Sequence, residues 1–457
     1  MTIELADALI AKYDVPGPRY TSYPTVPYWD GTPAQADWLA HIASALDAAS
    51  GAPGASLYVH IPFCRSLCTF CGCNTRITRT HSIVMPYLNT LLAEFDIYLR
   101  ALGRSRLELD ELHLGGGTPT FLDEAELEAL LSGLEARTLL RAGAVGSIEV
   151  DPRVTTLEQL IVLARHGFRR LSIGVQDFDP RVQDIVNRVQ SEACVAEVAR
   201  SARKLGFNSV NFDLIYGLPL QTEASVDNTV EAVCRLRPDR IALYGYAHVP
   251  WIRPGQRRFT DGDVPQAEQR RALYERSRER LEQAGYREVG LDHFALETDA
   301  LWLAQQSGSL HRNFMGYTDR ATLPLIGLGV SAIGDAGGAL AQNEKDLRQY
   351  QQRIEAGELP IHRGHILDGE DLVLRRHILR LMTRLETRWD APGDYTPFLA
   401  QLQRRLAEPE ADGLVELTDH GCRVTSLGRA FLRNLCMAFD ARLARQSPAR
   451  ALFSRTL

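Results

Sequence analysis

No run of about 18 uninterrupted apolar residues occurs in the 457-residue sequence, so it has no segment as apolar and as long as a bilayer-spanning helix needs. The first twenty residues carry acidic side chains early and no long apolar stretch, which fits neither a secretory signal nor a mitochondrial presequence. Basic charge is not in excess either, because 51 Lys and Arg stand against 57 Asp and Glu, for a formal net charge of −6. A mildly acidic protein has no overall attraction to nucleic acid or anionic lipid. We therefore expect a cytoplasmic protein with no nucleic-acid partner and no membrane insertion.

The sequence also lacks an evenly spaced set of cysteines that would suggest a disulfide framework. Half of the eight cysteines fall within ten residues, and the other half are scattered. Such clustering indicates metal chemistry in a reducing compartment. The clustered residues are Cys64, Cys68, Cys71 and Cys73, and the scattered ones are Cys194, Cys234, Cys422 and Cys436.

The composition is that of a globular protein, with 45% hydrophobic and 24% charged residues. A single core stops growing at roughly 250–300 residues, so this length favours one barrel-sized domain with an appendage. Short runs with β character alternate with segments of helical periodicity. The expected strands are Ser56–Ile61, Glu111–Leu114, Ser147–Val150, Arg170–Val175, Ser209–Ile215, Arg240–Tyr246 and Glu288–Asp292. The expected helices between them include Glu124–Arg137, Thr156–His166, Glu192–Leu205, Thr222–Leu236 and Ala267–Ala284.

Several of these helices end in a glycine before the next strand, at Gly167, Gly206 and Gly285, which suits a left-handed helix cap. Repeated strand–helix–strand units predict a parallel α/β sheet. We expect a complete or partial (β/α) TIM-type barrel rather than a doubly wound open sheet.

From about Asp368 the alternation of strands and helices ends. Two helical segments follow, and then a hairpin with a turn at Asp419–Gly421 and a final helix. This order predicts a mainly helical, winged-helix-like C-terminal domain. We therefore expect an N-terminal arm at 1–50, a catalytic barrel at 51–360 and the C-terminal domain at 361–457.

Three cysteines in the spacing Cys64-x3-Cys68-x2-Cys71 follow the first expected strand directly. Three soft sulfur ligands on one loop suit an iron–sulfur cluster. A 4Fe–4S cluster with three cysteine ligands leaves one iron open to a chelating group, which implies chemistry rather than simple electron transfer. The alternative is a structural zinc site that includes Cys73, although zinc loops usually supply their ligands as two separated pairs.

Polar side chains and glycines lie where the expected strands end. A Gly115-Gly116-Gly117 run closes the second strand, and absent side chains let backbone groups approach a ligand. In a barrel the carboxyl ends of the strands face one mouth, which makes polar residues there candidates for a site. These residues are Glu149, Asp151, Gln176, Asp213 and His248.

The cysteine triplet resembles that of the radical S-adenosylmethionine superfamily. Ten further blocks, in this order along almost the whole chain, resemble oxygen-independent coproporphyrinogen III oxidases. They are PRYTSYP, YVHIPFC, CTFCGCN, GGGTPT, IEVDPR, GVQDF, NFDLIYGLP, YAHVP, DHFA and HRNFMGYT. The stretch after DHFA, Leu296–Leu301, departs from the family pattern, which leaves the local loop uncertain but not the resemblance.

The resemblance implies a reaction in which two propionates of coproporphyrinogen III are oxidatively decarboxylated to vinyl groups, giving protoporphyrinogen IX in heme synthesis without oxygen. An unactivated propionate carbon holds its hydrogen too strongly for a side-chain base, so a cofactor radical performs the hard step and the protein supplies positioning. The family uses a 4Fe–4S cluster, two S-adenosylmethionine molecules, a low-potential electron donor and an electron acceptor, and it is monomeric.

Site residues follow from the resemblance, position by position. Cys64, Cys68 and Cys71 would bind the cluster, and Cys73 matches a cysteine that the family needs for activity. The cluster-bound S-adenosylmethionine would be held by Tyr58, Gly116, Glu149 and Ile333. The second S-adenosylmethionine would be held by Phe70, Gly117, Thr118, Gln176, Arg188, Asp213 and Ala247.

Arginines near the mouth would suit the propionates of the substrate, and Arg19 and Arg312 are the candidates. The alternative function is that of a heme-binding chaperone of the same superfamily. Cys73 and the PRYTSYP arm argue against it, because those relatives typically lack both.

Overall fold

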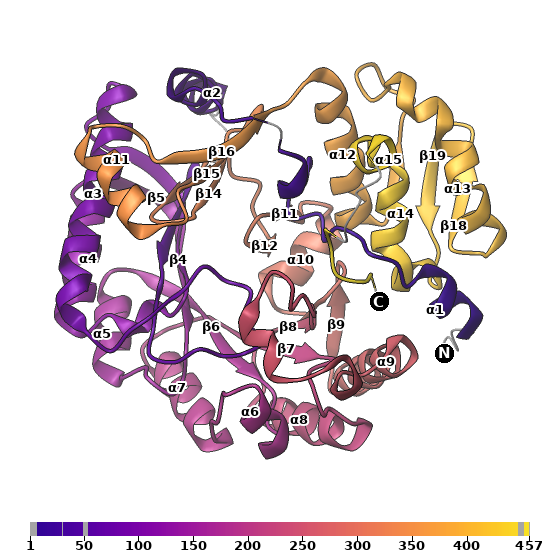
Figure 1. Cartoon of the computed structure of the whole chain (residues 1–457), viewed down its shortest axis with the longest axis horizontal. Helices are drawn as coiled ribbons and strands as arrows, with labels where there is room; N and C mark the ends of the chain where they lie inside the picture. Colours follow the sequence, from indigo (N-terminus) through magenta and orange to yellow (C-terminus); the bar gives the residue numbers. More distant parts are fainter. Residues whose placement is uncertain (1–6, 30, 49–53, 447–451, 457) are drawn as a thin grey trace.

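The computed structural model describes residues 7–29, 31–48, 54–446 and 452–456. The fold is mixed α/β, built on one large and mostly parallel sheet (Figure 1). In the described residues this sheet has twelve strands in the order β16-β15-β14-β13-β1-β4-β5-β6-β7-β8-β10-β9. None of the described helices has the length and apolar character that crossing a membrane requires.

The central strands are parallel, and from β1 to β8 their order follows the chain. β1 is buried throughout its length, as expected of a central parallel strand covered on both faces. The parallel strands are β13 (Leu325–Leu328), β1 (Ala55–Ile61), β4 (Leu107–Gly116), β5 (Thr138–Val150), β6 (Phe168–Gln176), β7 (Ser209–Tyr216) and β8 (Arg240–Gly245).

Helices join these strands and form an outer layer around the sheet (Figure 1). Five of them match the expected helices to within two residues at each end. The helices are α3 (Val84–Ala101), α4 (Glu124–Glu135), α5 (Leu157–Arg165), α6 (Pro180–Ile185), α7 (Glu192–Lys204), α8 (Glu223–Leu236) and α9 (Ala267–Gln283). The three glycines expected to end helices have φ values of +80°, +87° and +93°, as the left-handed cap requires.

The sequence prediction is wrong for the seventh strand, Glu288–Asp292. Gly290 adopts a φ of +62° and interrupts this segment. The chain instead forms an antiparallel hairpin of β9 (Tyr286–Val289) and β10 (His293–Leu296), and β10 pairs antiparallel with β8. On the opposite edge, β14 (Ile333–Asp335), β15 (Ala339–Asn343) and β16 (Ile361–Ile366) are also antiparallel.

The C-terminal part has a hydrophobic core of its own, and aromatic residues of the N-terminal segment, such as Tyr13, Tyr20 and Tyr23, belong to it. Figure 1 shows α1 (Asp7–Tyr13) beside this unit. Its remaining elements are α12 (Gly369–Arg384), β17 (Glu386–Arg388), α13 (Leu402–Ala411), β18 (Val415–Thr418), β19 (Gly421–Val424), α14 (Leu432–Ala438) and α15 (Ala441–Arg445).

The division into three domains stays a prediction. Its boundary at residue 50 lies outside the described residues. The strand β16, which that division assigns to the C-terminal domain, pairs with β15 in the main sheet. The segment 35–48, expected in the arm, forms α2 (Gln35–Ala48), and its Trp38 and Ile42 belong to the main core.

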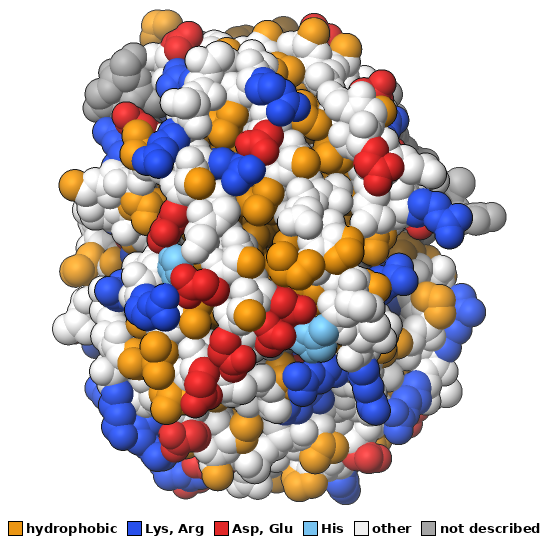
Figure 2. Space-filling model, turned by 90° about the vertical axis from the view of Figure 1, so that its left-hand side faces the viewer, with side chains coloured by type: hydrophobic (Ala, Val, Ile, Leu, Met, Phe, Trp, Pro, Cys, Tyr) orange, Lys and Arg blue, Asp and Glu red, His pale blue; other side chains and the backbone are white. Residues whose placement is uncertain are grey.

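Charge is mixed on the face shown in Figure 2, where acidic side chains form a band and basic ones are scattered around it. This face therefore presents no continuous basic surface of the kind that nucleic acid requires.

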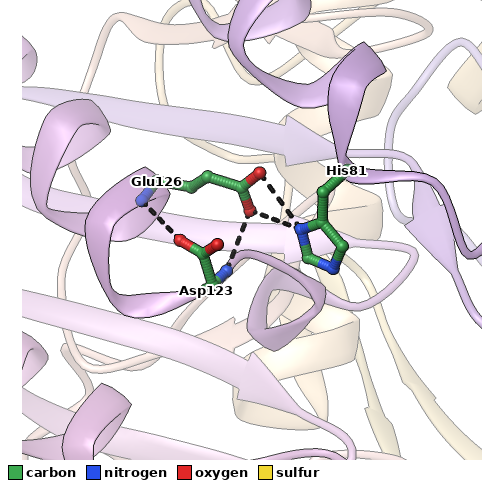
Figure 3. Close-up of side chains that lie close together, drawn as sticks. All are labelled: His81, Asp123 and Glu126. Carbon is green, nitrogen blue, oxygen red and sulfur yellow. Dashed lines mark hydrogen bonds and ion pairs between the residues drawn. The ribbon is translucent and has the colours of Figure 1, made fainter.

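Near α4, the side chains of His81, Asp123 and Glu126 lie close enough together to hold a metal ion, but hydrogen bonds explain their arrangement (Figure 3). The carboxylate of Asp123 accepts from the backbone N–H of Glu126, and the carboxylate of Glu126 accepts from the N–H of Asp123, both at 2.9 Å. This reciprocal pair is a capping box that begins the helix. His81 Nδ1 lies 2.9 Å from Glu126 Oε2, and its ring stacks on Phe121. These partners account for the cluster without an ion.

A buried carboxylate ties α3 to the end of β13 and to α11 (Leu347–Glu355). Glu94 is fully buried and accepts hydrogen bonds from the Gly329 N–H at 2.8 Å, Asn343 Nδ2 at 2.7 Å and Tyr350 Oη at 2.6 Å. Burial outweighs these donors and raises the pKa of Glu94 to about 7.

This shift predicts a pH dependence of stability. The folded state binds the Glu94 proton more tightly than the unfolded chain, so the stabilisation is present at low pH and is lost as the pH rises towards 7. Relative to wild type, we expect Glu94→Gln to gain roughly 2–3 kcal/mol in free energy of unfolding between pH 5 and pH 8. Urea denaturation of both proteins at the two pH values measures this difference. A constant difference would contradict the prediction.

Candidate active site

A cavity of about 310 Å³ lies at the carboxyl ends of four neighbouring parallel strands, β4 to β7. The cysteine loop that follows β1 forms one wall of it. In such sheets the strand ends and the loops after them converge on one face, which is where ligands bind. The lining includes Cys64, Cys68, Phe70, Cys71, Cys73, Gly116, Gly117, Thr118, Glu149, Asp151, Gln176, Arg188 and Asp213.

The cysteine loop is closed at its base by two short strands. β2 (Phe63–Cys64) pairs with β3 (Arg76–Ile77), so the ends of the loop are fixed together. Its middle is held by the segment after α6, because the Thr69 N–H donates to Val186 O at 3.0 Å and Asn187 Nδ2 donates to Leu67 O at 2.7 Å. The loop therefore has a defined shape before any ligand binds.

The three predicted cluster ligands, Cys64, Cys68 and Cys71, are half-buried, whereas Cys73 is exposed, and all four are free thiols. Cys64 Sγ lies 3.3 Å from Thr118 Oγ1. Hydrogen bonds from the Cys73 side chain and N–H lower the pKa of Cys71, and they outweigh the effect of its burial. Burial raises the pKa of Cys64 to about 11.

Arg188 connects the loop to the sheet. Its guanidinium donates to Cys68 Sγ at 3.6 Å, to Asp151 Oδ2 at 3.2 Å and to Gly174 O at 2.7 Å, and its buried Nε has no partner among the described residues. A side chain at Gly174 would lie 2.8 Å from this guanidinium, so only glycine leaves room for it. Arg153 also binds both Asp151 and Cys68, at 2.6 and 3.7 Å. Two guanidinium groups thus donate to one sulfur, that of Cys68.

Gly116, the last residue of β4, and Gly117 directly after it form a backbone cradle. Gly116 has a φ of +110°, and a Cβ there would lie 2.7 Å from the His60 ring. A Cβ at Gly117 would lie 2.7 Å from the Pro62 carbonyl oxygen. The Gly116 N–H donates to Glu149 Oε2 at 3.2 Å, which directs that carboxylate along the cavity wall. The predicted role of glycine as a close-approach residue is consistent with this geometry.

Asp213 lies in the second half of β7 and accepts from two donors, Ser172 Oγ at 2.7 Å and Asn211 Nδ2 at 2.9 Å. Burial raises the pKa of Asp213 to about 6, and the nearby charge of Glu149 adds to the shift. The two donors orient the carboxylate but offset the cost of its burial only in part. It is therefore suited to accept further hydrogen bonds, from ligand hydroxyl groups.

A second cavity, of about 340 Å³, adjoins the first on the inner side of the sheet. The two share Glu149, Ser172, Gln176 and Asp213 as lining residues. Gln176 has a φ of +66°, a conformation that non-glycine residues adopt mainly where the surroundings impose it. The second cavity is also lined by His113, Tyr244, His293, Asn313, Met315 and Tyr317.

Three predicted site residues do not line either cavity. Tyr58 is buried, with its hydroxyl 3.1 Å from His60 Nδ1, and it packs against Phe314. Ile333 belongs to another small core that also contacts Phe314. Ala247 is linked to the cysteine loop through the buried Gln256, whose Nε2 donates to both Ala247 O and Phe70 O.

Three other polar candidates lie elsewhere. His248 interacts with Tyr246 and Asp261 outside both cavities, so not every strand-end residue joins the site. Arg312 is buried, with its guanidinium 4.4 Å from the Tyr317 ring centroid, and its Nε and Nη1 have no hydrogen-bond partner among the described residues. Arg19 donates to Gly245 O and lines a third cavity.

Sequence reasoning missed several residues that shape the site, namely Arg153, Ser172, Gln256 and His113. Arg153 and Ser172 lie two residues from Asp151 and Gly174, and a search for partners of the strand-end residues could have found them. Gln256 carried no signal, because it lies in a short 3-10 helix, Pro254–Arg258, outside the strand–helix repeat.

Residues 58–233 match the family model of the radical SAM superfamily. Over 457 aligned residues the chain is 41% identical to the oxygen-independent coproporphyrinogen III oxidase of Escherichia coli (strain K12), covering 98% of both chains. The chain belongs to the oxygen-independent coproporphyrinogen III oxidase family. The family protein of Pseudomonas aeruginosa is 41% identical and covers 100% of this chain and 99% of its own. The solved structure of coproporphyrinogen III oxidase (HemN) from Escherichia coli, titled a radical SAM enzyme, superposes with a TM-score of 0.88 at 39% identity, over 96% of this chain and 100% of that one.

The close contact between the Gly116 backbone and His60 can be tested by a substitution in the apoprotein. Gly116→Ala would strain a positive φ and press a methyl group against His60. We expect it to reduce the free energy of unfolding of the apoprotein by about 2 kcal/mol. Gly72→Ala is the matched control, because a Cβ at Gly72 in the cysteine loop meets nothing within 4 Å. Equal free energies of unfolding of the two variants in denaturant titration would show that position 116 does not require glycine.

Proposed function

We propose that this chain is an oxygen-independent coproporphyrinogen III oxidase, which converts two propionates of coproporphyrinogen III to vinyl groups in heme biosynthesis. The observation that carries the proposal is identity of 41% across essentially the full length of curated family members. The cavity at the strand ends gives it a physical basis, because the cysteine loop, the glycine cradle and oriented carboxylates line one space.

The residues present fit a 4Fe–4S cluster better than zinc. Three sulfurs, those of Cys64, Cys68 and Cys71, share one loop, and two guanidinium groups beside Cys68 compensate negative charge. Cys73 does not have to be a ligand, and its exposed position suits a role towards the substrate. When bound, the cluster and S-adenosylmethionine supply a 5′-deoxyadenosyl radical.

The chain's own residues would position the reactants. Tyr58, Gly116, Glu149 and Ile333 would hold the cluster-bound S-adenosylmethionine, and the Gly116 N–H already orients the Glu149 carboxylate. A second S-adenosylmethionine would contact Phe70, Gly117, Thr118, Gln176, Arg188, Asp213 and Ala247, and Asp213 would accept from ribose hydroxyls. The adjoining cavity would receive the propionate, which loses hydrogen from the carbon next to the ring, then carbon dioxide and one electron.

The proposal includes two finer features of the fold. The main sheet is a partial (β/α) TIM-type barrel, as the chain-order strands and outer helices support (Figure 1). The C-terminal unit is mainly helical and winged-helix-like, which its helices and the small β17-β19-β18 sheet support. The enzyme would act as a cytoplasmic monomer with a low-potential electron donor and a separate electron acceptor.

The alternative function, a heme-binding chaperone, makes a different prediction. A carrier would bind heme stoichiometrically, and Cys73→Ser would leave its properties unchanged. An oxidase would form protoporphyrinogen from coproporphyrinogen III under anaerobic conditions, dependent on S-adenosylmethionine. Chromatography with fluorescence detection, with cell extract as the source of electron acceptor, distinguishes the two.

Two variants of the reconstituted enzyme separate cluster binding from cofactor binding. Cys64→Ala removes a cluster ligand, so we expect loss of S-adenosylmethionine cleavage together with loss of the cluster absorbance. Asp213→Asn keeps the shape and one acceptor oxygen, for the donor Asn211 Nδ2, while its amide NH2 replaces the oxygen that accepts from Ser172 and the charge is removed. We expect it to weaken S-adenosylmethionine binding by about tenfold, the effect of one charged hydrogen bond, with an unchanged cluster spectrum.

Normal cofactor cleavage by Cys64→Ala would refute the cluster assignment. Wild-type affinity in Asp213→Asn would remove Asp213 from the cofactor site.

A further inference from the structure

A third cavity, of about 230 Å³, lies between the catalytic sheet and the C-terminal unit, and no feature of the proposed mechanism uses it. It is bordered by the ends of β7 and β8, by α9, by the β9–β10 turn and by residues 426–433. Six arginines and four carboxylate residues line it, so its lining carries an excess of two positive charges. The arginines are Arg19, Arg270, Arg271, Arg278, Arg429 and Arg433.

Half of these arginines are already neutralised by carboxylates in the wall. Arg271 and Arg278 pair with Glu275, and Arg278 also pairs with Glu282. Arg429 lies 3.0 Å from Glu288. The remaining carboxylate of the lining, Asp292, binds His293 at 2.7 Å and lies 3.9 Å from Arg312. The acidic residues of the wall are thus engaged with other bases.

The other three arginines, Arg19, Arg270 and Arg433, have no carboxylate within 4.0 Å among the described residues. They donate only to backbone carbonyls: Arg19 to Gly245 O, Arg270 to Tyr246 O at 3.1 Å, and Arg433 to four carbonyls of the two terminal segments. Arg270 Nε is buried and has no partner at all in the described part of the chain.

The positive charges of these three guanidinium groups repel one another. Burial, together with the charges of Arg19 and Arg270, lowers the pKa of Arg433 to about 9. Burial and the charge of Arg19 also lower the pKa of Arg270. Guanidinium groups remain charged in proteins, and buried charges without a counter-ion are costly. Arg433 is buried and Arg19 and Arg270 are half-buried, so an anion in the cavity would stabilise these three charges.

Two glycines make room for this arrangement. A Cβ at Gly217, where φ is +79°, would lie 3.0 Å from Arg270 Nε. A Cβ at Gly245 would lie 2.9 Å from the Tyr216 hydroxyl and 3.3 Å from Arg270 Nη2. Bulkier residues would displace the guanidinium from its place at the cavity wall. Glycine at these two positions therefore leaves space near the ends of β7 and β8 for the guanidinium of Arg270, whose Nε has no partner in the described part of the chain.

We propose that the cavity lined by Arg19, Arg270 and Arg433 is an oxyanion-binding site, which takes a carboxylate or phosphate group. Planar guanidinium groups offer two parallel donors to such groups. The site lies beyond the ends of β7 and β8, on the same edge of the sheet as Asp213 and Ala247. The oxyanion is either a free anion or a propionate of the porphyrinogen. Only the second source rests on the proposed function.

The test uses the full-length chain, with Arg270→Gln as the site variant and Arg276→Gln as the matched control. Arg276 lies on the same helix but pairs with Glu223 and Asp227 away from the cavity. Thermal unfolding is followed in sodium phosphate and in sodium chloride at equal ionic strength. We expect phosphate to raise the Tm of wild type and of Arg276→Gln saturably, and to have no such effect on Arg270→Gln.

A fluorescence titration with coproporphyrin III, the stable oxidised form that carries the same four propionates, distinguishes the two sources. If a propionate is the ligand, Arg270→Gln binds the porphyrin about tenfold more weakly, as loss of a charged hydrogen bond implies, and phosphate competes with it. If a free anion is the ligand, the phosphate effect depends on Arg270 but the porphyrin affinity does not change. Either result supports the oxyanion site.

The proposal is overturned if phosphate and chloride give wild type the same Tm and Arg270→Gln binds the porphyrin as wild type does. It is also overturned if Arg270→Gln lowers the Tm equally in both salts while its phosphate shift persists, because that is the behaviour of a purely structural arginine. A wild-type protein that binds phosphate through Arg270 but binds no porphyrin would count against the proposed function and leave the oxyanion site intact.

Discussion

The candidate site depends on one buried ion pair, between Arg188 and Asp151, which fixes the cysteine loop to the sheet. Asp151 ends a central parallel strand, and Arg188 follows a short helix of the next unit along the sheet. The same guanidinium reaches Cys68 and the Gly174 carbonyl, so one side chain joins three parts of the site. Arg153 also binds Asp151, at 2.6 Å, so loss of Arg188 would leave the carboxylate one cationic partner and cost less than the ~3–5 kcal/mol of an unpaired buried charge. The arrangement of the sulfurs is therefore a property of the fold.

Backbone chemistry then determines what can approach this loop. The strand ends converge because the central strands are parallel, and glycine at 116 and 117 leaves N–H groups and space where side chains would collide with His60 and Pro62. Oriented carboxylates, Glu149 and Asp213, stand between the first cavity and the second. The result is a continuous lining with a cluster-type loop at one end and polar aromatic residues at the other, which is what a radical reaction on an extended substrate requires.

Sequence patterns predicted most of the parallel strands and, in the lining of the first cavity, four cysteines, two glycines and four polar residues near strand ends, because these are local signals. Phe70, Thr118 and Arg188 were predicted only from the family resemblance. Asp213 and Gln176 could be placed from the ends of their strands alone. The seventh strand could not, since Gly290 converts it into a hairpin that only tertiary pairing reveals. His248 also followed the strand-end pattern, yet its partner Asp261 draws it to a separate cluster. Arg153 and Gln256 were missed because their roles depend on contacts distant in sequence, with Cys68 and Phe70.

The most direct test of this account is hydrogen–deuterium exchange of residues 64–77 in the apoprotein. Arg188→Gln should accelerate exchange in that segment by about tenfold or more, as loss of a buried ion pair worth over 1.4 kcal/mol implies. Arg181→Gln, which changes an exposed arginine on the short helix before Arg188, should exchange like wild type. Unchanged exchange of the loop in Arg188→Gln would show that the ion pair does not hold the cysteines in place.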